Sequence, residues 1–239
     1  MAGTITAANL LLRIRDTLQD TTGIRWLDAE LLRYMNDAQR EIVNLRPDAS
    51  STTANVALVV GTAQTLPTAG LRLIKVVRNM SAAGGSATGK RAIRIVDREI
   101  LDTQEPDWHD PTVGGDATHA TTVKHYVFDE DDPRRFYVYP GASSTSTFIE
   151  IVYSTSPTDF ANSSSATMFV DDIYANALID YVLYRAYMKD AEFAGNAQRA
   201  SSHYQLFVGS VTQGGQVQTM VSPNNDGMGM MAPQQPGGV

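Results

Sequence analysis

The residues best suited to chemistry lie in one acidic and aromatic stretch, DEDDPRRFYVYPG, which begins at Asp129. Four successive carboxylates could bind a divalent cation, but the stretch lacks the alternate-position ligands, the sixth-position glycine and the terminal glutamate of a calcium loop. After the turn, strand alternation would place Arg135, Tyr137 and Tyr139 on one face, where two rings and a guanidinium could stack on nucleic-acid bases. The acidic turn beside them would repel phosphate. We therefore interpret the stretch as a β-hairpin, whose register the sequence does not fix.

A loop upstream holds two histidines and three carboxylates that could bind a metal ion. His109 and His119 lie ten residues apart, and Asp107, Asp110 and Asp116 accompany them. Imidazoles and carboxylates are common zinc ligands, but this separation matches no recognised ligand spacing. The sequence therefore predicts a solvated loop and no metal site.

The same loop offers two acids for glycoside hydrolysis, which needs carboxylates that face each other across about 5–10 Å. Glu105 and Asp107 flank Pro106, directly before Trp108. Neighbouring acids do not establish that separation, so a peptidoglycan hydrolase stays an alternative, and Trp108 is interpreted as an apolar anchor of the loop. Neither a phosphate-binding glycine loop nor a GxSxG nucleophile motif occurs. No catalytic residue and no cofactor is predicted.

Composition narrows the class of protein. The 239 residues contain no cysteine, which excludes disulfides and thiolate metal sites, and the net charge is −7. The 19 lysines and arginines are dispersed, so the chain lacks the basic stripe of a general nucleic-acid binder. No apolar run approaches the roughly 18–20 residues of a membrane span, so no membrane partner is predicted. Arg13 and Arg15 interrupt the apolar residues of the N-terminal segment, which is typical of an amphipathic helix rather than a signal peptide.

Apolar residues at helical spacing predict two helices at each end of the chain. Pro47 ends the second of them, and the polar stretch SPTDFANSSSATM precedes the third. The four predicted core stripes are Ala7, Leu10, Leu11, Ile14 and Leu18; Leu31, Met35, Ala38, Ile42 and Leu45; Ile173, Ala177, Tyr181, Tyr184 and Met188; and Ala197, Ala200, Tyr204, Phe207 and Val211.

Between the helices, short runs rich in β-branched and aromatic residues predict six strands, separated by connectors of glycine, proline and serine. The strands are residues 55–60, 71–80, 91–97, 123–129, 135–140 and 147–154. Helices that bracket strands predict an α+β protein, in which a four-helix bundle from the N- and C-terminal helix pairs carries an inserted antiparallel β-rich domain. The predicted domains are residues 1–49 and 167–212, the two halves of the bundle, and residues 50–166, the insertion.

The last segment, residues 213–239, consists mainly of glycine, proline, glutamine and methionine, with scarcely any charge. Such a segment cannot form a core alone, so the sequence predicts a flexible C-terminal tail that becomes ordered on a partner. Because methionine adapts to irregular grooves, Met220, Met228, Met230 and Met231 are the predicted docking residues.

Taken in order, the segments resemble the head-to-tail adaptor (connector) proteins of tailed bacteriophages, including the tail-tubular-A-like adaptors of short-tailed phages. The resemblance rests on the helix–β–helix frame and on five segments that cover most of Trp26 to Phe207. These segments are WLDAELLRYMNDAQREIVNLRPDA, LPTAGLRLIKVVRNM, REILDTQEPDWHD, DPRRFYVYPG and DIYANALIDYVLYRAYMKDAEFAGNAQRASSHYQLF.

The resemblance implies a structural protein of the virion neck or tail, assembled in the host cytoplasm and without catalytic activity. Such adaptors form a ring, commonly of twelve copies, between the portal protein and the tail or nozzle protein, and DNA passes through the ring without specific binding. The C-terminal tail would dock on the portal. The hairpin residues Asp131, Asp132, Arg134 and Arg135 would contact a neighbouring subunit or the tail. Another neck, tail-completion or decoration protein of the virion is the alternative.

Overall fold

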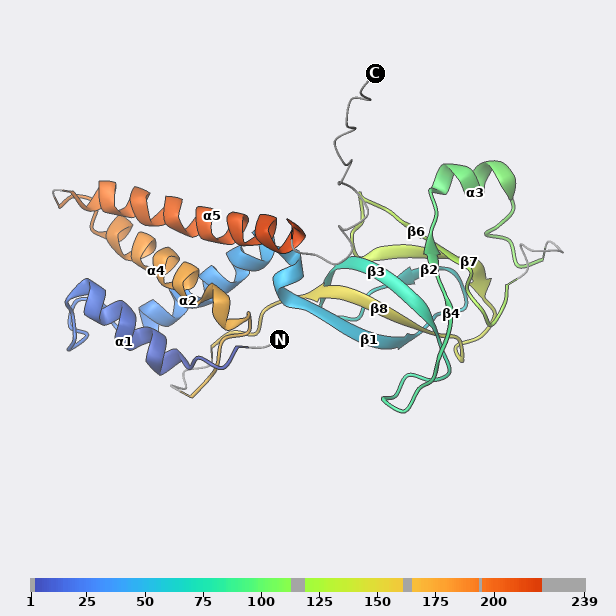
Figure 1. The fold of residues 1–239 in the computed structure, drawn as a ribbon, viewed down its shortest axis with the longest axis horizontal. Coiled ribbons are helices and arrows are strands. Elements are labelled where there is room, and N and C mark those ends of the chain that lie inside the picture. Colours follow the sequence, from blue (N-terminus) through green and yellow to red (C-terminus); the bar gives the residue numbers. More distant parts are fainter. Residues whose placement is uncertain (1–2, 113–118, 161–164, 194, 221–239) are drawn as a thin grey trace, which may run out of the picture.

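The computed structural model describes residues 3–112, 119–160, 165–193 and 195–220, the last seven of these by their backbone alone. Within these residues the chain forms a helical part and a β part that lie at opposite ends of an elongated molecule (Figure 1). Each part has a hydrophobic core of its own. The predicted α+β class is confirmed.

The helical part contains α1 (Ala7–Leu18), α2 (Asp28–Leu45), α4 (Ala175–Lys189) and α5 (Asn196–Met220). Buried side chains from all four helices belong to one hydrophobic cluster, and α4 packs against the other three helices. The N- and C-terminal helix pairs therefore share a core, while their arrangement as a regular four-helix bundle stays a prediction. α5 continues to Met220, past residue 213, at which the predicted tail begins.

Helical periodicity predicts the core of α1 and α2 well and that of α4 only in part. Most residues of the first two stripes are buried, although Leu45 at the end of α2 is 37% exposed. In the other two stripes, Ile173 is 66% exposed, Met188 48% and Tyr204 41%, so these four assignments to the core were wrong. Ile173 belongs to a short 3-10 turn, η2 (Asp172–Tyr174), where the spacing of an α-helix no longer holds. α4 is also buried on several sides, because its neighbours surround it. Its additional buried residues are Ala175, Leu178, Ile179, Val182, Leu183 and Ala186.

The segment that leads from the β part to α4 is held on α2 by two amide side chains. The Gln39 side chain is buried and accepts a hydrogen bond from the Phe169 backbone N–H at 2.7 Å. One turn earlier, Asn36 accepts from the Phe160 N–H at 2.8 Å. A buried amide needs such partners, so these two contacts fix the path of the returning chain.

The β part contains two four-stranded sheets that pack face to face around a second core. The first sheet has the order β1-β8-β3-β4, with β1 (Ser51–Ala57), β8 (Phe148–Thr155), β3 (Gly70–Met80) and β4 (Gly89–Ala92), all antiparallel. The second has the order β2-β7-β6-β5, with β2 (Gly61–Thr65), β7 (Arg135–Ala142), β6 (His125–Phe128) and β5 (Arg94–Ile95). β5 pairs with β6 in parallel, so the second sheet is mixed rather than purely antiparallel.

Three details of the predicted strands were wrong. Residues 61–65 were predicted as a connector but form β2, because the side chains that face inward, Thr62 and Gln64, are polar and conceal the strand pattern. The predicted strand 91–97 is divided into β4 and β5, which belong to different sheets. The predicted strand 135–140 is too short, since β7 continues through Gly141 to Ala142.

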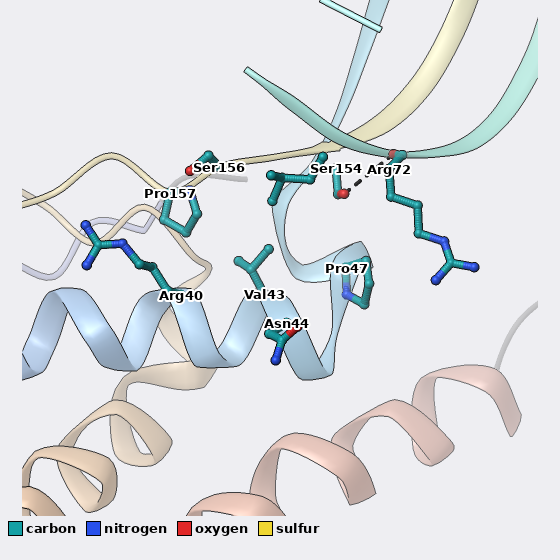
Figure 2. Close-up of a pocket in the computed structure, with 9 residues that line it drawn as sticks. Arg40, Val43, Asn44, Pro47, Arg72, Ser154, Ser156 and Pro157 are labelled. Atoms are coloured by element: carbon teal, nitrogen blue, oxygen red, sulfur yellow. Dashed lines mark hydrogen bonds between the residues drawn. The ribbon is translucent and has the colours of Figure 1, made fainter. Parts of the chain in front are cut away.

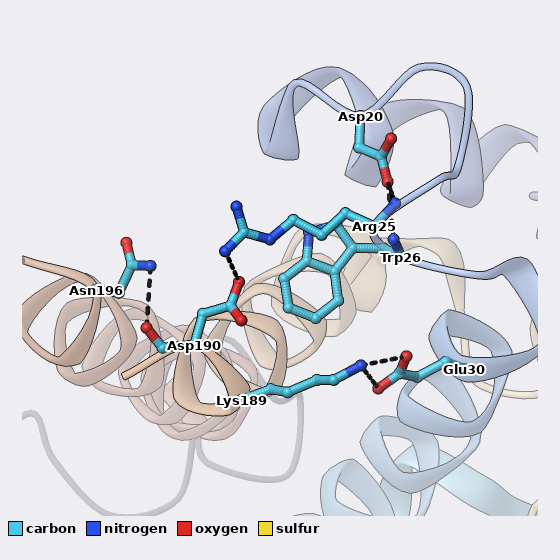
Figure 3. A network of polar contacts seen from close by, with 7 residues as sticks. All are labelled: Asp20, Arg25, Trp26, Glu30, Lys189, Asp190 and Asn196. Atoms are coloured by element: carbon cyan, nitrogen blue, oxygen red, sulfur yellow. Dashed lines mark hydrogen bonds and ion pairs between the residues drawn. The ribbon is translucent and has the colours of Figure 1, made fainter. Parts of the chain in front are cut away.

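A network of polar contacts closes the outer end of the helical part (Figure 3). The Asp20 carboxylate accepts hydrogen bonds from the backbone N–H groups of Trp26, Arg25 and Ile24 at 2.8, 2.9 and 3.1 Å. These bonds, that from Trp26 above all, lower the pKa of Asp20. Arg25 forms an ion pair with Asp190. The loop before α2 is thereby joined to the end of α4.

A second ion pair at this end joins α4 to α2. Lys189 Nζ donates to both carboxylate oxygens of Glu30 at 2.8 Å, and the same ammonium lies 5.0 Å from the centre of the Trp26 ring. Burial of Glu30 opposes its ionisation, but the hydrogen bonds from Lys189 and Tyr34 prevail and lower its pKa. The same surroundings raise the pKa of Tyr34 to about 12, mainly through burial.

We expect the Glu30–Lys189 pair to stabilise the fold at neutral pH and not in acid. Because the pKa of Glu30 is lower in the folded state, its contribution is present above the unfolded value near 4.5 and is lost as pH falls through the folded value. Glu30→Gln should lower the free energy of unfolding by about 0.5–1 kcal/mol at pH 7 and by less at pH 3, measured by urea denaturation. Glu192→Gln, an exposed acid without an ion pair in the described part of the chain, is the control. A Glu30→Gln cost that does not change with pH would contradict the assignment.

Phe207 on α5 should be a principal contributor to the helical core. Its side chain is fully buried, and its ring centre lies 5.1 Å from that of Tyr181 on α4. Phe207→Ala should therefore cost about 3–5 kcal/mol of unfolding free energy in a denaturant titration. Leu206→Ala, which alters a neighbouring side chain that is 58% exposed, should cost less than about 1 kcal/mol. Equal costs for the two variants would show that α5 is not packed as described.

Candidate interaction surfaces

The histidines and carboxylates of the predicted loop have other contacts. Within the described residues, no three histidine, aspartate or glutamate side chains form a group that could hold a metal ion. His109 Nδ1 lies 2.7 Å from the Thr62 hydroxyl, and Asp110 accepts hydrogen bonds from the backbone and side chain of Thr112. Burial, followed by the nearby Arg98 cation, lowers the pKa of His109. The side chain of His119 lies against Gly141, and Asp116 is outside the described residues.

Trp108 lies at the centre of a small cluster on the outer face of β7. Its ring is fully buried, and Nε1 donates to Asp102 Oδ1 at 2.8 Å; Asp102 belongs to α3 (Arg98–Gln104). Tyr137 and Tyr139 meet the indole edge-on, with ring centres 6.0 and 6.4 Å away. The two tyrosines share a face, as predicted, but Trp108 covers that face. The rings are therefore not a free platform for stacking bases.

The other face of β7 belongs to the core between the sheets, where Phe136 and Val138 are buried. Both faces of the strand are thus covered, which settles the register question that the sequence left open. Glu105 and Asp107 occupy turn positions before the same cluster. The carbonyl of Glu105 accepts from the Trp108 N–H at 2.9 Å, and that of Asp107 accepts from the Asp110 N–H at 2.8 Å. Neither residue lines the groove beside Arg40 and Arg72 or the pocket formed by Arg91, Arg94, Lys124 and His125.

The charged hairpin turn between β6 and β7 is held by its own side chains. Asp129 Oδ1 accepts from the Asp131 N–H at 3.1 Å, and Asp132 Oδ1 accepts from the Arg134 N–H at 3.2 Å. Arg134 also donates to the Thr68 carbonyl, and Arg135 lies 3.8 Å from the Asp132 carboxylate. Asp131, Asp132, Arg134 and Arg135 are nevertheless exposed, so the surface of the turn carries charges of both signs.

A groove separates the helical part from the β part on one side (Figure 2). Its volume is about 430 Å³. The helical side contributes Arg40, Asn44 and Pro47, and the sheet side contributes Leu71, Arg72 and Ser154. These residues come from three distant segments, so no local sequence signal predicts the groove.

Large apolar side chains are exposed at the outer end of the helical part. Ile24 and Leu27 precede α2, Phe193 follows α4, and their exposed fractions are 83%, 63% and 61%. The Arg25 guanidinium lies 5.1 Å from the centre of the Phe193 ring and so belongs to the same surface.

Of the four predicted docking residues of the C-terminal tail, one lies among the residues that the structure describes. Met220 is the last residue of α5, described by its backbone, and Met228, Met230 and Met231 lie outside the described residues. Among the described helices, none is long and apolar enough to cross a membrane.

Comparison with known families covers almost the whole chain. A model of the SU10 adaptor protein family matches residues 5–226, which include every helix and strand described above. No curated protein matches the sequence. The match agrees with the resemblance to phage head-to-tail adaptors, which are structural proteins rather than enzymes. A match of this extent shows that the chain belongs to the SU10 adaptor protein family.

Proposed function

We propose that the protein is a ring-forming head-to-tail adaptor that joins the portal to the tail and surrounds the channel for DNA. The observation that carries this proposal is the family match over both parts of an elongated chain. Membership in the family already implies a place in the virion neck and contact with portal and tail proteins in general. The ring of about twelve copies is part of the proposal.

The two separate cores support a role that requires two partners. Because the helical part and the β part each have a core, each can bind a partner without disturbing the packing of the other. We assign the helical part (residues 1–49 and 167–212) to the portal side and to lateral packing in the ring. We assign the inserted part (residues 50–166), with the hairpin residues Asp131, Asp132, Arg134 and Arg135, to the tail or to a neighbouring subunit.

The net charge of the chain supports passage of DNA without tight binding. With a charge of −7, the protein as a whole repels phosphate rather than attracting it. A channel with such walls would let the duplex slide. Assembly of the ring would then depend on contacts between proteins and not on the nucleic acid.

The full-length chain mixed with its portal protein should form rings whose symmetry matches the portal. Two-dimensional class averages from electron microscopy test this directly. Binding of single copies to the capsid surface, with no ring on the portal, would favour a decoration protein. A ring found only at the far end of the tail would favour a tail-completion protein.

Removal of residues 221–239 should weaken portal binding and leave the fold intact. The last buried side chain in the described part of the chain is Val211, so the truncated protein should keep its melting temperature within about 2 °C. Its affinity for the portal, measured by sedimentation, should fall at least tenfold if the tail docks there. The full-length variant Met228→Gln, Met230→Gln, Met231→Gln should show a similar loss, because it removes the apolar side chains and keeps the length. Unchanged binding by both variants would refute docking by the tail.

A further inference from the structure

Four basic side chains line one concave pocket at the edge of the second sheet. Arg91 and Arg94 come from β4 and β5, and Lys124 and His125 come from the start of β6. The pocket has a volume of about 290 Å³, which suits one or two small anionic groups. The residues lie about 30 positions apart in the sequence, so folding alone brings them together.

A buried asparagine fixes the backbone that carries these side chains. Asn79 is only 2% exposed, and its Nδ2 donates to the carbonyls of Arg91 and Val123 at 3.0 and 2.8 Å. Its Oδ1 accepts from the Val123 N–H at 2.8 Å. On the other side, the Arg94 N–H donates to the Lys124 carbonyl at 3.3 Å. The two basic segments are thus held together before any ligand binds, which lowers the entropic cost of binding.

The pocket concentrates positive charge in an acidic chain. Burial lowers the pKa of His125, and the cations of Arg91, Lys124 and Arg94 lower it further. The Nδ1 atom of His125 is buried and has no hydrogen-bond partner among the described residues. Arg91 and Arg94 form no ion pair with any acid in the described part of the chain. The guanidinium groups of Arg91 and Arg94 therefore have no counterion among the described residues and favour an anion from another subunit.

The same chain presents exposed acidic side chains in the turn of the β6–β7 hairpin. In the turn of the hairpin, Glu130 and Asp131 are exposed and form no ion pair within the described residues, whereas Asp132 lies near its own Arg135. The basic pocket includes the first residue of β6, and this turn follows the last residue, Phe128. The four residues of β6 span about 13 Å and keep the two apart, so they can meet only between two copies.

We propose that the acidic turn of one subunit, residues 129–132, docks in the basic pocket of the neighbouring subunit. This inference rests on the proposed ring and names one of its lateral contacts. Two different surfaces that complement each other produce a head-to-tail contact, which closes into a ring when the rotation allows it. A DNA duplex is the weaker candidate, because the cations are gathered in one small pocket and do not follow a stripe.

A charge exchange tests the pairing in the full-length chain assembled on its portal protein. Arg91→Glu with Arg94→Glu should raise the protein concentration needed for ring formation about tenfold or more, and Glu130→Lys with Asp131→Lys should do the same. The variant with all four substitutions should recover most of the wild-type assembly, because the two charges are exchanged. Lys75→Glu, which alters an exposed lysine on β3 outside the pocket, should assemble as the wild type does. Melting temperatures of all variants verify that each is folded.

The other outcomes distinguish a failure of the docking from a failure of the proposed function. If the wild type forms rings and either double variant assembles equally well, or the four-fold variant does not recover, the docking is refuted and the proposed function stands. If the Arg91→Glu, Arg94→Glu variant assembles normally but retains less duplex DNA in a filter-binding assay, the pocket serves DNA and the docking is again refuted. If the wild type forms no ring on the portal, the proposed function fails and the docking falls with it.

Discussion

The pairing of the first strand with the last determines how the two parts of the molecule are joined. β1 and β8 run antiparallel from Ser51 opposite Ser154 to Ala57 opposite Phe148. Just outside this ladder, the Thr155 hydroxyl donates to the Ser50 carbonyl at 3.2 Å in a buried position. The chain therefore leaves the helical part and returns to it at one place. Because of this, α2 and α4 reach the same side of the sheet and can share a core, although the β part separates them in sequence.

The elements that the sequence predicts best are those that pack against neighbours on one side only. α1 and α2 each bury a single face, so their residues at helical spacing identify most of the core, although Leu45 at the end of α2 is exposed. α4 has neighbours on several sides, so a single stripe leaves out much of its core and wrongly includes Ile173 and Met188. β2 has polar residues on its inward face, because Gln64 bonds to the backbone of the preceding turn. Its alternation is therefore invisible to a search for hydrophobic residues.

The sequence predicts a surface formed by one local segment, but not a surface that combines distant segments. The hairpin turn is local, and its charges are visible in the run DEDDPRR. The basic pocket, in contrast, depends on Asn79, which lies inside an ordinary strand pattern and bonds to residues 12 and 44 positions away. The groove of Figure 2 likewise combines α2, β3 and β8. Such sites arise from pairing between distant segments, and a single sequence carries no signal of that pairing.

The junction at β1 and β8 also has a mechanical meaning. Two covalent segments cross between the helical part and the β part, one before Ser51 and one after Thr155, and they cross side by side. A tensile load between the two ends of the molecule would be divided between these two segments. Both strands would be pulled from the same end and in the same direction, so the load would not peel one from the other. The hydrogen bonds between the two strands would transfer force from one segment to the other, so neither would carry the load alone.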